Sequence, residues 1–221
     1  MRERKSSVLW RLARVGPALL VLAAIGCAES RLVRSPPPPI FGLRLAARPA
    51  PAAQATFTRT LPRYGEAPAL WQPSGAERSW QYIVVHHSAT TSGSAARFDA
   101  VHRAKGWDEL GYHFVIGNGT GSGDGEVEVG GRWFKQKHGA HCKVAGHPEY
   151  NDVGIGICLV GNFNETHPSD AQMESLGRLV RYLMSRYDVP QGRVYGHGQL
   201  KATDCPGRLF DFADLRRRIG R

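Results

Sequence analysis

Short runs of apolar residues predict strands in the last two thirds of the chain. Residues 81–86 form one such run, rich in β-branched side chains and bounded by polar residues, which is typical of a buried strand. Similar runs predict further strands at residues 112–117, 126–129, 153–160 and 193–195. A glycine-rich turn at residues 117–125 joins two of them as a hairpin.

Helical periodicity appears between these strands. Residues 169–187 carry apolar side chains at spacings of three and four, Ser169 can cap the first turn, and Pro190 lies beyond the end. Residues 94–105 predict a second helix that stops at Gly106, and a basic helix follows from about residue 211. Helices alternating with strands predict an α/β domain over residues 75–221, with a single mixed central β-sheet flanked by helices.

The first 74 residues show no such pattern. Five Lys and Arg residues precede an apolar run at 15–25, which predicts an export signal over residues 1–26 that is too short to span a bilayer. Residues 27–74 are rich in Pro, Ala and Arg and read as a tether. An alternative for residues 57–71 is an N-terminal arm that packs on the domain.

The signal ends in residues 22–27, Leu-Ala-Ala-Ile-Gly-Cys, which resemble the lipobox of bacterial lipoproteins. This resemblance implies cleavage before Cys27 and a lipid anchor on it; the alternative is an ordinary cleaved signal and a soluble periplasmic or secreted protein. In lipoproteins of this kind, an aspartate directly after the cysteine favours the inner membrane. This chain has Ala28 at that position, which favours the periplasmic side of the outer membrane. We therefore expect an exported, membrane-anchored monomer.

Charge and cysteine content narrow the partners. After residue 26 the chain keeps 24 basic and 18 acidic residues, a net charge of +6, which suits an anionic cell wall. No basic cluster interleaved with aromatic residues is present, so we expect no nucleic-acid partner. Besides Cys27, three cysteines remain, an odd number for an oxidising compartment, so at least one has a role other than a disulfide.

Three separated segments carry candidate chemistry. His86 ends the first strand, His197 follows the last strand, and Cys205 lies in the next loop. Imidazole and thiolate are preferred zinc ligands, and a catalytic site uses three of them and keeps a fourth position open. His87 points to the other face of its strand and is expected to be structural, and Cys158, in the middle of a strand, is expected to be an inert buried thiol.

From about residue 80 to its end, the sequence resembles the type 2 N-acetylmuramoyl-L-alanine amidases, which include phage lysozyme-amidases and peptidoglycan recognition proteins. The resemblance is carried by five motifs in order: Val-His-His-Ser-Ala-Thr at 85–90, Gly-Tyr-His-Phe-Val-Ile at 111–116, Gly-Ala-His at 139–141, the apolar run at 153–163, and Gly-His at 196–197 with Thr-Asp-Cys-Pro-Gly at 203–207.

The resemblance implies a Zn²⁺ ion on His86, His197 and Cys205, catalytic roles for Tyr112 and Thr203, and a substrate contact at His141. For His141 the alternative is a residue that supports a metal ligand. The implied activity is metal-assisted hydrolysis of the amide between N-acetylmuramic acid and L-alanine of peptidoglycan, with no general acid assigned.

Two other functions compete with this one. Some members of the family bind wall fragments without cutting them, but such members commonly lack the cysteine ligand, which this chain retains. A zinc peptidase would be expected to carry a carboxylate base beside its ligands, as in His-Glu-x-x-His, and this sequence has none.

Overall fold

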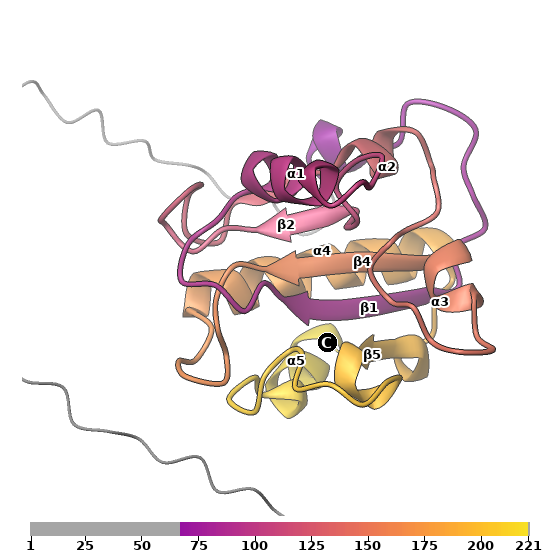
Figure 1. Ribbon diagram of the computed structural model, residues 1–221. Coiled ribbons are helices and arrows are strands. Elements are labelled where there is room, and N and C mark those ends of the chain that lie inside the picture. Colours follow the sequence, from indigo (N-terminus) through magenta and orange to yellow (C-terminus); the bar gives the residue numbers. More distant parts are fainter. Residues whose placement is uncertain (1–66, 221) are drawn as a thin grey trace, which may run out of the picture. The chain divides into compact units, whose positions relative to one another are not determined.

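The computed structural model of the protein describes residues 67–220 (Figure 1). The predicted signal and lipidation site, Cys27 included, and most of the predicted tether lie outside the described residues. The helices and strands, with 3-10 helices written η, are η1 (Ala69–Trp71), β1 (Tyr82–His87), α1 (Ala95–Ala104), β2 (Phe114–Ile116), β3 (Val127–Val129), α2 (Gly131–Phe134), α3 (Glu149–Asp152), β4 (Gly154–Leu159), α4 (Asp170–Tyr187), η2 (Gln191–Arg193), β5 (Val194–Gly196), η3 (His197–Gln199) and α5 (Phe212–Ile219). No helix within residues 67–220 is both long and apolar enough to cross a membrane.

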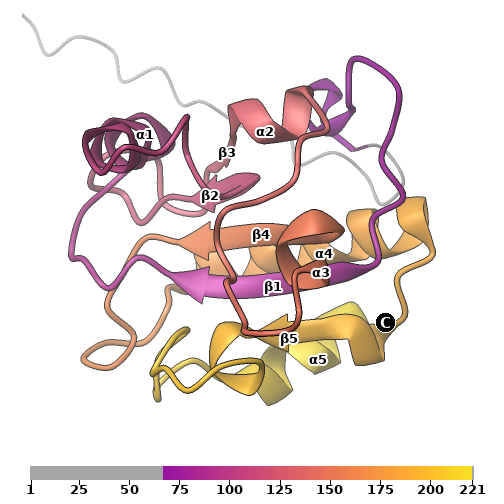
Figure 2. The same cartoon turned by 45° about the vertical axis from the view of Figure 1, so that its right-hand side comes forward.

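The five strands form one mixed sheet in the order β3-β2-β4-β1-β5. Strands β2, β4, β1 and β5 are parallel, and β3 pairs antiparallel with β2. Strand β1 therefore lies between β4 and β5, as Figure 2 shows, with His86 opposite Cys158 of β4. This arrangement confirms the predicted single mixed sheet.

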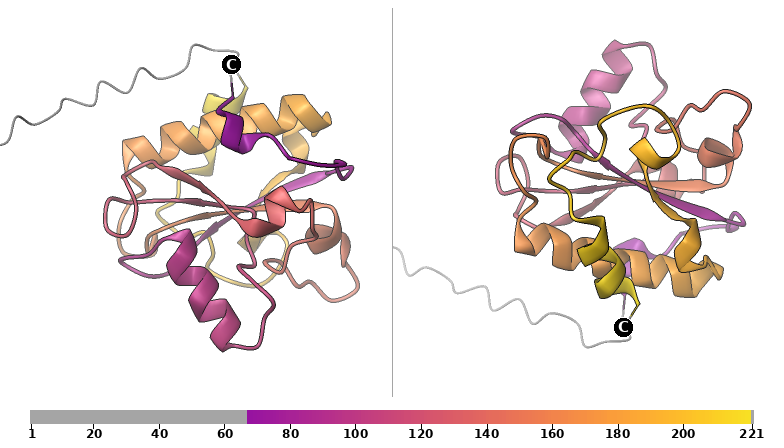
Figure 3. Two further views of the ribbon diagram at one scale, coloured as in Figure 1. Left: turned by 90° about the horizontal axis from the view of Figure 1, so that it is seen from above. Right: turned by 90° about the horizontal axis from the view of Figure 1, so that it is seen from below.

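Helices cover the two faces of the sheet differently. Figure 3 shows α4 over one face and α1 over the other. Ile83 and Val85 of β1 are fully buried in the same cluster as Leu179 of α4. On the opposite face, Phe98 of α1 packs with Val115 in a smaller cluster. Since side chains alternate along a strand, Tyr82, Val84 and His86 face the α1 side of the sheet, whereas His87 faces the α4 side.

Helix α4 matches its prediction closely because its ends are capped. Ser169 and Gln172 form a capping box in which the Ser169 hydroxyl accepts the backbone N–H of Gln172. The Gln172 amide also donates to the carbonyl of Val160 at 2.9 Å, which ties the start of the helix to the end of β4. The helix ends at Asp188, which adopts the left-handed conformation.

Strand β2 is shorter than predicted because, at its start, a side chain and not the backbone accepts a hydrogen bond from the neighbouring strand β4. The ring nitrogen Nδ1 of His113 accepts the N–H of Gly156 at 2.9 Å, so β2 begins only at Phe114. Residues 69–71, assigned from the sequence to the tether, pack on the domain instead: Trp71 is 3% exposed and its carbonyl accepts the indole N–H of Trp133. The N-terminal arm that the sequence left as an alternative is therefore present from residue 67.

Candidate metal centre

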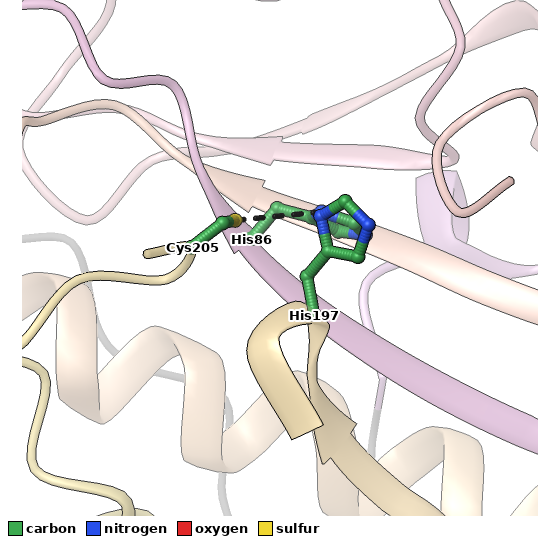
Figure 4. A group of neighbouring side chains, drawn as sticks. All are labelled: His86, His197 and Cys205. Atoms are coloured by element: carbon green, nitrogen blue, oxygen red, sulfur yellow. Dashed lines mark hydrogen bonds between the residues drawn. The ribbon is translucent and has the colours of Figure 1, made fainter. Parts of the chain in front are cut away.

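Two neighbouring parallel strands bring the candidate ligands together at their carboxyl ends. His86 lies near the end of β1 on the face opposite α4, and His197 follows the last residue of β5. Cys205 approaches from the loop after η3 (Figure 4). One donor atom from each residue lies within 4.8 Å of the other two.

The geometry and chemistry of these donors fit a zinc ion. Zinc bonds of about 2.05 Å to nitrogen and about 2.3 Å to sulfur, at a tetrahedral angle, separate the two ligand atoms by about 3.6 Å. Sγ of Cys205 lies 3.6 Å from Nδ1 of His86. The buried Nε2 of His197 has no hydrogen-bond partner within residues 67–220. The three residues therefore form a possible metal site.

The protonation of the donors is also suitable. Burial, reinforced by the neighbouring histidines, holds the pKa of His86 well below its usual range, so its ring stays neutral and able to ligate. Burial raises the pKa of the Cys205 thiol to about 12, while the backbone N–H of His87, 3.4 Å from Sγ, favours the thiolate. A bound cation would shift this balance to the thiolate, which is the form that ligates zinc.

The loop that carries Cys205 is closed by local hydrogen bonds. The N–H of Gly198 donates to the Cys205 carbonyl at 2.6 Å, which joins the two ends of the loop. Thr203 is exposed, and its hydroxyl accepts the N–H of Cys205 at 3.4 Å. Gly207 has a φ of +108°, and a Cβ there would lie 2.4 Å from the backbone of Phe163, so the loop requires glycine at this position.

Tyr112 lies beside the first ligand. Its ring centroid is 5.3 Å from that of His86. Burial raises the pKa of the Tyr112 phenol well above its usual value, and Cys158 and Cys205 reinforce the shift, so the hydroxyl keeps its proton. The Tyr112 ring therefore lies beside the first candidate ligand, with its hydroxyl protonated. Thr203 lies in the loop that carries Cys205, where its hydroxyl accepts the Cys205 N–H.

His141 lies behind His86 and not on an open surface. Its side chain is buried, with Nδ1 at 3.1 Å from Nε2 of His86 and Nε2 at 3.2 Å from the carbonyl oxygen of Gly154. Burial lowers the pKa of His141 to about 4, so the ring is neutral. Both ring nitrogens are engaged within the protein, which favours the supporting role over the substrate contact that the family resemblance implied.

The remaining candidates have structural surroundings. Nδ1 of His87 accepts the N–H of Phe163 at 3.1 Å, on the opposite face from the metal donors. Cys142, Cys158 and Cys205 are all free thiols. Cys158 is buried and lies opposite His86 in the pairing of β1 with β4.

Space for a ligand opens beside Cys205. A depression of about 440 Å³ is lined by Asn164 and by the segment from Asp204 to Arg208. Of the three candidate metal donors, Cys205 belongs to the wall of this depression, whereas His86 and His197 do not.

Comparisons with known proteins identify the family and agree with the fold. Residues 76–208 match the N-acetylmuramoyl-L-alanine amidase family. Peptidoglycan-recognition protein SC1a of Drosophila melanogaster is 30% identical over 165 residues, 70% of this chain and 82% of that protein. The N-acetylmuramoyl-L-alanine amidase of Sus scrofa is 29% identical over 158 residues, 66% of this chain but only 24% of the pig protein.

A solved structure shows the same fold. The endolysin N-acetylmuramoyl-L-alanine amidase LysCS from Clostridium intestinale URNW superposes with a TM-score of 0.55 at 30% identity, covering 64% of this chain and 86% of that one. Because the family match spans more than half of the 221 residues, the chain belongs to the N-acetylmuramoyl-L-alanine amidase family.

Proposed function

We propose that this protein is a zinc-dependent amidase that hydrolyses the amide bond between N-acetylmuramic acid and L-alanine in peptidoglycan. The observation that carries the proposal is the convergence of His86, His197 and Cys205 to within 4.8 Å. Family membership supports it, since relatives are named as amidases of this bond or as peptidoglycan-recognition proteins.

Each residue of the centre has a distinct task. Zinc supplies Lewis acidity, which polarises an amide carbonyl and makes water nucleophilic at neutral pH. His86 and His197 hold the ion as neutral donors, and Cys205 holds it as a thiolate. The depression beside Cys205 admits the substrate to this side of the centre.

Tyr112 stabilises the charge that develops on the carbonyl oxygen. Its hydroxyl remains protonated because burial raises the phenol pKa, so it can donate a hydrogen bond to an oxyanion. Thr203 contributes a second hydroxyl at the rim once substrate displaces its contact with the Cys205 N–H. Within residues 67–220 no carboxylate hydrogen-bonds a residue of the centre, so we assign no carboxylate as the proton donor to the leaving amine.

A peptidoglycan-binding protein without activity is the second candidate function, supported by relatives named as recognition proteins. Retention of the third metal donor, Cys205, favours the enzyme, because a binding role requires no thiolate at this position.

Digestion of purified peptidoglycan by the purified chain separates the two functions. We expect mass spectrometry to find free stem peptides that begin at L-alanine, lost on zinc chelation, restored by added zinc and absent with Cys205→Ser. Cys142→Ser, which removes a buried free thiol outside the donor set, is the matched control and should cleave like the parent. Sedimentation with peptidoglycan without release of peptides would refute the amidase and support the recognition protein.

We also propose that the protein is exported and anchored by a lipid on Cys27 to the periplasmic side of the outer membrane. The lipobox-like ending of the signal and Ala28 support this. Metabolic labelling with a fatty acid followed by membrane fractionation tests it. Label that persists in Cys27→Ser, or an unlabelled parent protein, would exclude the lipid anchor.

A further inference from the structure

We propose that His141 is a positioning residue that determines which nitrogen of His86 carries the proton, and thereby presents Nδ1 of His86 to the metal. This inference rests on the proposed zinc site. It concerns metal binding and not the identity of the bond that is cut.

The direction of the two hydrogen bonds of the His141 ring follows from the Gly154 carbonyl, the one partner that cannot donate. The Gly154 carbonyl oxygen can only accept, so Nε2 of His141, 3.2 Å away, must carry a proton and donate. In a neutral imidazole the other nitrogen then has a lone pair. Nδ1 of His141 therefore accepts from Nε2 of His86, which lies 3.1 Å away.

The same reasoning applies to the next ring. If Nε2 of His86 donates its proton to His141, then Nδ1 of His86 has the free lone pair. Nδ1 is the atom that lies 3.6 Å from Sγ of Cys205, on the side of the metal donors. The opposite tautomer of His86 would place a proton where the metal must bind.

The His141 ring is held in place on two sides. A Cβ on Gly156 would lie 2.3 Å from the ring, and one on Gly139 would lie 2.4 Å from it, so both glycines are needed to admit it. The side-chain oxygen of Asn151 accepts the backbone N–H of His141 at 2.9 Å. This packing leaves the ring no room to turn and exchange its two nitrogens.

Glycine therefore has a specific role inside strand β4. A glycine in a strand interior usually weakens it or marks a close approach of another group. Here Gly156 makes space for the ring, and Gly154 provides the carbonyl that orients it. The Gly-x-Gly pattern within an apolar strand was the sequence signal for this arrangement.

The first test is the tautomer of His86 in the zinc-free parent protein, read from its side-chain ¹⁵N resonances and their couplings. We expect the proton on Nε2 of His86 and an unprotonated Nδ1. A His86 protonated on Nδ1 would overturn the inference, and this measurement needs no variant to fold.

The second test is zinc affinity in two variants, measured by competition with a chromogenic chelator. His141→Phe keeps a ring but cannot accept a proton from His86, so we expect zinc affinity to fall by about 10- to 100-fold. In His141→Asn the side-chain oxygen takes the place of Nδ1 and can accept that proton. We expect this variant to recover most of the affinity and to retain the parent tautomer of His86.

The outcomes separate this inference from the proposed function, because neither test uses peptidoglycan. Parent-like zinc affinity in a folded His141→Phe would overturn the positioning role even if the protein is an active amidase. Conversely, the expected affinities in a protein that cuts no peptidoglycan would support the positioning role and refute the amidase. A parent that binds no zinc would refute both.

Discussion

Arg132 offers the sharpest test of how the site is held in place. This residue of α2 is 1% exposed, yet it carries a positive charge. Its guanidinium donates to the carbonyl of Leu110 at 2.6 Å and to that of His138 at 2.7 Å, and it pairs with Asp108. Arg132 thus joins the segment before Tyr112 to the one that precedes the positioning histidine.

The cost of removing this group can be worked out from its partners. Arg132→Met keeps the apolar stem but leaves two backbone carbonyls without their donor, at about 1–3 kcal/mol each. Asp108 is 48% exposed and can be hydrated instead, so its lost ion pair adds little. We therefore expect the free energy of unfolding to fall by about 2–6 kcal/mol, a large share of the about 5–15 kcal/mol of a typical domain.

Urea unfolding followed by far-UV circular dichroism measures this loss. Arg217→Met is the matched control, because Arg217 is 61% exposed and pairs with Asp211, the N-cap of α5, and with Asp214 in its first turn. We expect it to cost about 1 kcal/mol or less. Arg132→Lys, which retains the charge and can reach one carbonyl, should fall between the two. If Arg132→Met costs no more than Arg217→Met, the buried guanidinium does not hold these segments and the reasoning is refuted.

Three further predictions follow from contacts described above. Tyr112→Phe should lower kcat on peptidoglycan by about 100- to 1,000-fold and leave zinc affinity unchanged; unchanged kcat would remove Tyr112 from catalysis. Burial depresses the pKa of His113, and that of His141 to about 4, below the unfolded value of 6.5, so unfolding takes up protons in acid. Both rings should therefore lower the stability of the zinc-free protein as pH falls below about 6.5. For His141 the loss should be up to about 1.4 kcal/mol per pH unit down to about pH 4, measured by urea titration, and a flat profile would contradict this. Ser169→Ala should cost about 1 kcal/mol in thermal unfolding, since the N–H of Gln172 loses its cap, and an unchanged midpoint would show that the cap is dispensable.

Periodic patterns predicted the sheet and its long helix because those patterns arise from burial. The apolar spacing from Met173 to Leu183 and the Ser169 cap placed α4 within one residue of its observed start at Asp170. The single mixed sheet was also predicted correctly. The short helices α2 and α3 were not predicted, because four residues are too few to show a period.

Other features depend on contacts between distant segments and leave no local pattern. An arginine is normally read as exposed, so nothing in the sequence marked Arg132 as buried. Trp71 looked like part of the tether because its partners, Trp133 and Tyr182, lie far along the chain. The place of His141 depends on the pairing of β1 with β4, which motifs alone do not show.

The way the three metal donors are distributed along the chain has a consequence for chain entropy. His86 belongs to the middle of the sheet, whereas His197 and Cys205 belong to one short loop near the C-terminus. A bound metal would thus be a cross-link that closes a loop of about 110 residues. In the chain-entropy account of disulfides, a cross-link that closes so long a loop removes more entropy from the unfolded chain than one that closes a short loop. The cysteines of the described residues are all free, so among them this coordination would take the place of a covalent cross-link.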